Sequence, residues 1–162
     1  MPETLIRQAL RDSVTEVLEK MFFVEMLREL PDGAAGESPA EEIAAGLTFE
    51  GERSGAFLLR LTTVAARQIA ADFLGIDEPE VSDTQTSDVV RELANMICGS
   101  VLSRLESAAT FRLAEPRIVP PSKEIAGNPA YIHYAAELPN GRLIVSLGAG
   151  IPLCPQPAQS AY

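Results

Sequence analysis

The sequence predicts an α+β domain of two layers, in which long helices pack on one face of a largely antiparallel sheet. Two long segments, one from Glu3 to about Arg28 and one that ends near Ser107, repeat their apolar residues at helical spacing. Two further segments alternate apolar and other residues on either side of a short turn, which is typical of β-hairpins. Because hairpins join antiparallel strands, we expect an antiparallel sheet beside the helices.

The first helix is expected from Glu3 to about Arg28, and its apolar face consists of Ile6, Leu10, Val14, Val17, Leu18, Met21 and Phe22. It is expected to end before the turn residues Pro31, Asp32 and Gly33. The following residues up to Pro39 are rich in Gly, Pro, Ala and acid, so they predict a surface loop.

A hairpin and a shorter helix are expected next. Ile43, Ala45, Leu47 and Phe49 alternate with other residues, the turn occupies residues 51–55, and residues 56–61 form the second strand. Thr62 or Thr63 is expected to cap a helix that stops at Gly75, and residues 77–79 form a connector.

The longest helix is expected from about Asp83 or Thr86 to Ser107, with Val89, Val90, Leu93, Ile97, Val101 and Leu105 on one face. Residues 111–119 then predict a strand, and residues 120–129 a loop. The second hairpin is expected from residues 130–138 and 142–147, because Pro139-Asn140-Gly141 lies between two alternating runs. The chain length of 162 residues fits a single domain over 1–150, followed by a flexible Pro-rich tail over 151–162.

Composition excludes several classes of function. The formal net charge of -10 would repel the phosphate backbone of nucleic acid, so we expect no binding to nucleic acid.

The two cysteines, Cys98 and Cys154, do not have the spacing of a disulfide framework, and the amino-terminal residues do not resemble a leader peptide. We therefore expect a soluble, cytoplasmic protein. The single histidine, His133, lies in an alternating stretch and is expected to be a strand residue, and no set of residues has zinc-ligand spacing.

The long helix carries a polar stripe opposite its apolar face. Asp88, Glu92, Asn95 and Gly99 are spaced by four, three and four residues, which places them on one side of a helix. A Glu-x-x-Asn pair most often belongs to a solvated helix face. Here, however, Asn and Gly are poor helix formers, and glycine costs about 1 kcal/mol relative to alanine. A role other than helix stability would account for them, and Gly99 would let another protein approach closely.

The segment Asp88-Val-Val-Arg-Glu92-Leu-Ala-Asn95-Met-Ile-Cys-Gly99 resembles the Asp/Ser-x-x-x-Glu-x-x-Asn signature of the CheC, CheX and FliY chemotaxis phosphatases, and it is most similar to the single-site CheX-like proteins. The order of expected elements from Glu3 to Gly148 is also similar, so the resemblance implies a CheC-like domain. The sequence differs from the family pattern near Ile118, where the family usually has a proline.

The resemblance implies a phosphatase that removes phosphate from a phospho-aspartyl, CheY-like response regulator. Asn95 would orient the attacking water, because an amide both donates and accepts hydrogen bonds without adding charge. Glu92 would pair with a lysine in the active site of the regulator, and Asp88 and Gly99 would border the contact surface. The protein would need no cofactor of its own, because the regulator would carry the Mg²⁺.

The first helix looks like a degenerate copy of this site. Residues 12–23 align with residues 88–99, so that Glu16 corresponds to Glu92. Glu19 stands where the asparagine is needed and Phe23 where the glycine is, and an ionised Glu19 would repel phosphoryl oxygens. Glu16 and Glu19 are therefore expected to form an inactive second site, although a shared amphipathic pattern would also produce much of the match.

Two other hypotheses remain open at this point. The same helix face would serve a non-catalytic adaptor that binds a response regulator, in chemotaxis or in another signalling pathway. A structural dimer is the other hypothesis, since related CheX proteins join their sheets and the hairpin from Tyr131 to Leu147 would offer a sheet edge.

Overall fold

The computed structural model describes residues 2–31, 40–106, 110–120 and 128–149, and within them a seven-stranded sheet lies against three α-helices. The elements are α1 (Glu3–Glu16), η1 (Val17–Met21), β1 (Arg28–Leu30), β2 (Glu42–Glu50), β3 (Gly55–Thr62), α2 (Thr63–Leu74), η3 (Glu78–Glu80), α3 (Asp83–Leu105), β4 (Arg112–Leu113), β5 (Arg117–Val119), β6 (Ile132–Leu138) and β7 (Gly141–Ala149). The predicted two-layer α+β fold is confirmed.

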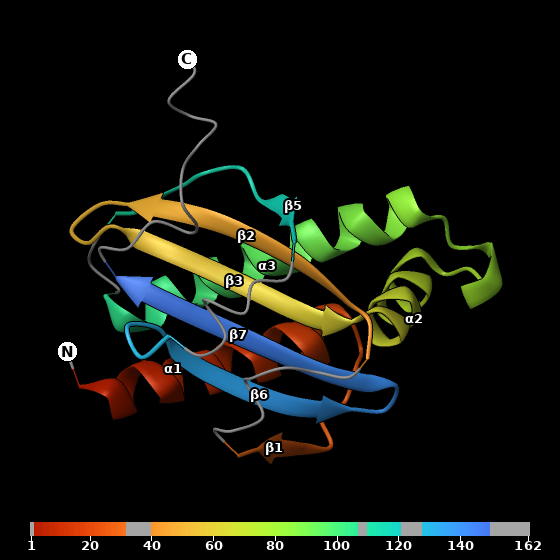
Figure 1. Cartoon of the computed structure of the whole chain (residues 1–162), viewed down its shortest axis with the longest axis horizontal. Helices are drawn as coiled ribbons and strands as arrows, with labels where there is room; N and C mark the ends of the chain where they lie inside the picture. The colour runs from red at the N-terminus through yellow and green to blue at the C-terminus, as the bar shows by residue number, and fades with distance from the viewer. Residues whose placement is uncertain (1, 32–39, 107–109, 121–127, 150–162) are drawn as a thin grey trace.

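The strands follow the order β1-β6-β7-β3-β2-β4, β5 also pairs with β2, and all these pairings are antiparallel. Figure 1 shows α1 and α3 behind the sheet and α2 at one end of it. Both predicted hairpins are present as β2 with β3 and β6 with β7. The expected strand over 111–119 forms as two short strands on either side of Pro116.

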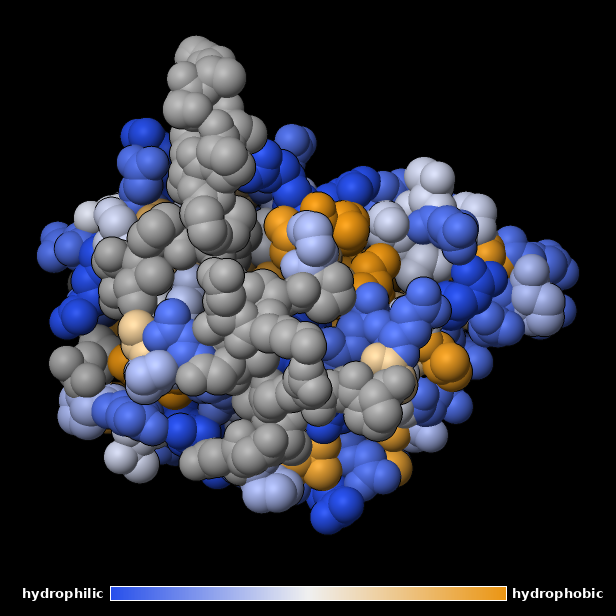
Figure 2. Space-filling view, in the orientation of Figure 1, coloured by the Kyte–Doolittle hydropathy of each residue, from blue (hydrophilic) through white to orange (hydrophobic). Residues whose placement is uncertain are grey.

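The main core lies between the sheet and the helices. Phe57, Leu59 and Leu61 of β3 are fully buried in it, as every second residue of a strand with one packed face should be. The intervening residues point to the other face, where Ala44, Ala56, Leu58 and Tyr131 form a smaller cluster. On that face, hydrophobic areas lie among hydrophilic residues (Figure 2).

His133 is a strand residue, as predicted. It lies on β6, and its neighbours Ile132 and Tyr134 belong to the core on the helix side. The imidazole therefore points to the sheet face away from α3, where Nδ1 lies 2.7 Å from the hydroxyl of Ser146.

The first helix is shorter than predicted. α1 ends at Glu16 and continues as the single wider turn η1, after which Phe22 has a φ of -120° and Phe23 a φ of +59°. From Phe22 to Leu27 buried or half-buried residues alternate with exposed ones, and β1 then pairs with β6. The prediction of a helix to Arg28 was wrong because burial follows a strand period from Phe22 on, which the apolar residues do not reveal: Phe23 and Leu27 are apolar and yet exposed.

The expected free edge of the second hairpin also needs correction. β7 lies between β3 and β6, and β1 covers β6 from Ala135 to Glu137. The hairpin is therefore not the end of the sheet, and dimer formation stays a prediction. The expected loop up to Pro39, the expected end of the long helix at Ser107, the middle of the loop over 120–129 and the tail over 151–162 lie outside the described residues.

Candidate functional site

The polar stripe lies on α3, whose start is set by a capping box. The Oγ atom of Ser82 accepts a hydrogen bond from the backbone N–H of Gln85 at 3.0 Å. The side-chain oxygen of Gln85 in turn accepts one from the backbone N–H of Ser82 at 2.9 Å. These two bonds satisfy amides that a helix start otherwise leaves without partners. The helix therefore begins at Asp83, the earlier of the two expected starts.

The buried side of α3 determines which way the stripe faces. Val90, Leu93, Ile97 and Val101 are almost completely buried in the core between α3, the sheet and α1. The opposite side is left accessible, with Asp88 and Glu92 exposed and Asn95 and Gly99 half-buried. At 3.6 residues per turn these four residues lie within an arc of about 60° and span about 16 Å along the axis.

The two central side chains of the stripe are available for contacts. No hydrogen bond or ion pair joins the side chain of Glu92 or Asn95 to another described residue, whereas Asp88 forms an ion pair with Arg91. At Gly99 an added Cβ would meet nothing within 4 Å. Packing among the described residues therefore does not require a glycine there, and the backbone at Gly99 faces open space.

The corresponding residues of the first helix have different surroundings. Glu16 binds Arg104 of α3 at 2.8 Å and lies 3.6 Å from Lys20. The hydrogen bond and charge of Arg104, followed by the charge of Lys20, hold the pKa of Glu16 below its usual value. The regular helix ends at this residue, so Glu19 falls in the wider turn η1, and Phe23 lies beyond the helix and is 82% exposed. These residues do not reproduce the stripe of α3.

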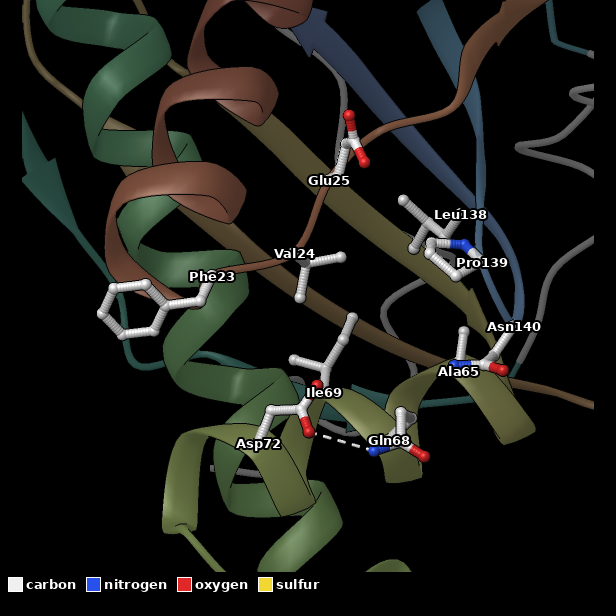
Figure 3. A pocket seen from close by; sticks show the side chains of 10 residues that line it. All are labelled: Phe23, Val24, Glu25, Ala65, Gln68, Ile69, Asp72, Leu138, Pro139 and Asn140. Carbon is white, nitrogen blue, oxygen red and sulfur yellow. Dashed lines mark hydrogen bonds between the residues drawn. The ribbon is translucent and has the colours of Figure 1, made fainter.

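Two hollows lie near the ends of the helices. One, of about 260 Å³, lies where α2 approaches the β6-β7 turn and includes Phe23, Ile69 and Asp72 (Figure 3). The other, of about 640 Å³, runs between β2, β5 and the start of α3 and includes Ser87 and Ile118. Neither is lined by Glu92 or Asn95. A row of accessible side chains along one helix suits a protein partner, whereas small molecules usually bind in concave sites.

The described part of the chain holds no group of three or more His, Cys, Asp and Glu side chains arranged to bind a metal ion. Nor does any described helix combine the length and the apolar composition needed to cross a bilayer.

Cys98 lies on the buried side of α3, and burial raises the pKa of its thiol to about 12. The thiol therefore stays protonated near neutral pH, and we expect it not to react with a thiol reagent at about pH 8 while the protein is folded. The measurement uses a Cys154→Ser variant, so that any reaction with the reagent comes from Cys98. Unfolding in concentrated guanidinium chloride should make Cys98 reactive. Rapid reaction in the native protein would contradict the buried position.

The family model described as chemotaxis phosphatase CheX matches residues 43–133, which include the whole stripe. The fold is similar to that of chemotaxis protein CheX from Vibrio vulnificus, with a TM-score of 0.72 and 18% identity over 92% of this chain and 99% of that chain. A CheC-like superfamily protein from Shewanella sp. PV-4 has a TM-score of 0.67 and 19% identity over 90% of this chain and 97% of that one.

A third similar structure is the CheX-CheY-BeF3-Mg²⁺ complex from Borrelia burgdorferi, with a TM-score of 0.65 and 16% identity over 88% of this chain and 96% of that one. Identities this low establish the fold alone, and the fold agrees with the CheC-like domain that the sequence predicts. No curated protein sequence is significantly similar to the chain.

Proposed function

The chain belongs to the CheX family of chemotaxis phosphatases, and from this we propose that it hydrolyses the aspartyl phosphate of a CheY-like response regulator. The observation that carries the proposal is the pair Glu92 and Asn95 on one accessible face of α3, with no partner among the described residues. The complex of a similarly folded CheX with CheY supports a CheY-like partner.

In the proposed reaction, water attacks the phosphorus atom and the bond from phosphorus to the aspartyl oxygen breaks. The aspartate leaves as a carboxylate, and the proton of the water goes to the inorganic phosphate that is formed. The regulator supplies the phosphorylated aspartate and Mg²⁺, so this chain has only to place the water in line with the breaking bond. The amide of Asn95 suits that role because its oxygen accepts from the water while its NH₂ group donates to a phosphoryl oxygen.

Glu92 has a different role in the proposal. An ionised carboxylate accepts hydrogen bonds only, so it would repel the phosphoryl group and instead bind a cation beside it. We propose that this cation is the lysine in the active site of the regulator, and that Asp88 and Gly99 border the contact. We expect no second active site on the first helix, because Arg104 binds Glu16 and because Glu19, in η1, stands where the asparagine is needed.

Replacing Glu92 by lysine is expected to abolish the productive complex, because two ammonium groups would then face each other. Affinity for a receiver domain loaded with Mg²⁺ and BeF3⁻ should fall at least about 30-fold, as for a close ion pair at an interface. Isothermal titration calorimetry measures the affinity, and release of inorganic phosphate measures the activity.

Glu50→Lys is the matched control, because Glu50 is an exposed acid at the end of β2 and its replacement changes the net charge equally. The control should bind as the wild type does. Equal losses in the two variants would mean that net charge and not the position of Glu92 governs binding, and this would contradict the proposed contact.

A further inference from the structure

Arg91 lies at the edge of the stripe, next to residues to which the proposed function gives roles. It directly precedes Glu92 and lies one turn before Asn95, and its side chain is 38% exposed. At 100° per residue, Arg91 and Glu92 leave the helix in directions about 100° apart, and Asn95 lies between these two directions one turn further on. The surface therefore presents a guanidinium and a carboxylate on either side of an amide.

Arg91 is the only cationic residue of α3 from Asp83 to Gly99. The next one along the helix, Arg104, binds Glu16, and Arg67 of the neighbouring α2 binds Glu78 and Asp83. In a chain whose formal net charge is -10, this stretch of α3 thus carries a single cation, directly next to Glu92. Such a face is complementary to a partner that carries an ammonium group beside an anion.

The ion pair with Asp88 holds Arg91 at the edge of the stripe. Asp88 is 58% exposed at its side chain, and an exposed pair three residues apart on a helix stabilises the protein only slightly. A phosphoryl group carries more charge and offers three acceptor oxygens, so it competes well for the planar fork of an arginine. Arg91 could therefore leave the carboxylate of Asp88 and bind a phosphoryl oxygen at little cost in free energy.

We propose that Arg91 is the specificity-determining residue that makes this surface prefer the phosphorylated receiver domain over the unphosphorylated one. In the free chain it is bound by Asp88, and in the complex it binds a phosphoryl oxygen beside the amide of Asn95. The inference rests on the proposed function and adds to it the group that recognises the phosphorylated state.

The test compares affinities for one CheY-like receiver domain with Mg²⁺ alone and with Mg²⁺ and BeF3⁻, a stand-in for the phosphoryl group. Arg91→Gln is expected to lower the ratio of the two affinities by about tenfold or more, as loss of one charge-assisted contact does. Arg91→Lys should restore part of the ratio, because the charge remains and the fork is lost. In turnover, KM for the phosphorylated domain should rise more than kcat falls.

Arg112→Gln is the matched control, since Arg112 is an exposed arginine on β4. The proposal is overturned if Arg91→Gln keeps the wild-type ratio of affinities, or if Arg112→Gln lowers the ratio equally. If either result is found while the wild type still binds and dephosphorylates the domain, the proposed role of Arg91 is wrong and the proposed function stands. If the folded wild type neither prefers loaded receiver domains nor dephosphorylates them, the proposed function fails with it.

Discussion

Replacing Asn95 by alanine is expected to reduce the maximal rate of dephosphorylation by about 100-fold or more, the usual effect of removing one preorganised donor from a transition state. The amide is the only group in the proposed site that orients the water, so its loss should appear in kcat. Asn95 is half-buried within a helix whose contacts lie on the other side, so the variant should fold normally. Single-turnover phosphate release at saturating chain concentration measures the effect.

Binding separates this effect from a simple loss of docking. Affinity of Asn95→Ala for a receiver domain loaded with Mg²⁺ and BeF3⁻ should stay close to that of the wild type, since Glu92 and Arg91 remain. Ser103→Ala is the control, because Ser103 is an exposed polar residue near the end of the same helix. Activity of Asn95→Ala within about twofold of the wild type would contradict the assigned role, because that is the spread expected of neutral surface substitutions.

Replacing Leu93 by alanine is expected to lower the free energy of unfolding by about 2–5 kcal/mol, as for other fully buried leucines. Leu93 has no exposed surface and lies directly after Glu92 on the side of α3 that faces the core. The loss reflects both the apolar surface removed and the cavity left behind. Urea denaturation followed by circular dichroism measures it, with the activity of the folded fraction determined in parallel.

Val64→Ala is the control for this prediction. Val64 lies on α2 and is 63% exposed, so its truncation should change the free energy of unfolding by no more than about 0.5 kcal/mol. A cost for Leu93→Ala as small as that of the control would show that α3 is not held by its buried side, and the orientation of the stripe would then lack its structural basis.

The parts of the fold that local signals determine could be predicted from the sequence. The cap at Ser82 and the regular apolar spacing identify α3, and the turn at Asn140 and Gly141 identifies the second hairpin. The end of the first helix could not be predicted in the same way. β1 forms by pairing Arg28 with Glu137, which lies 109 residues away, and no local pattern reveals such a partner.

The same distinction applies to the candidate site. Helical spacing alone places Glu92 and Asn95 on one face, because that depends only on residues of one helix. The pairing of Glu16 with Arg104 depends on how α1 packs against α3. The sequence could therefore indicate a degenerate copy of the site, but not that Arg104 binds its glutamate. The pairing of Asp88 with Arg91 could have been predicted from the sequence, since a spacing of three is one of the two that let an ion pair form on a helix.

The central claim is that this chain accelerates hydrolysis of an aspartyl phosphate, and the most direct test needs only the wild-type protein. A CheY-like receiver domain is phosphorylated with a small-molecule donor, the donor is removed, and the half-life of the phosphorylated form is followed with Mg²⁺ at increasing chain concentration. The rate constant of phosphate loss should rise linearly with the chain concentration, and the half-life should shorten accordingly, until the domain is saturated. An unchanged half-life at concentrations where calorimetry shows the complex to be formed would contradict the claim and identify the protein as a binding adaptor.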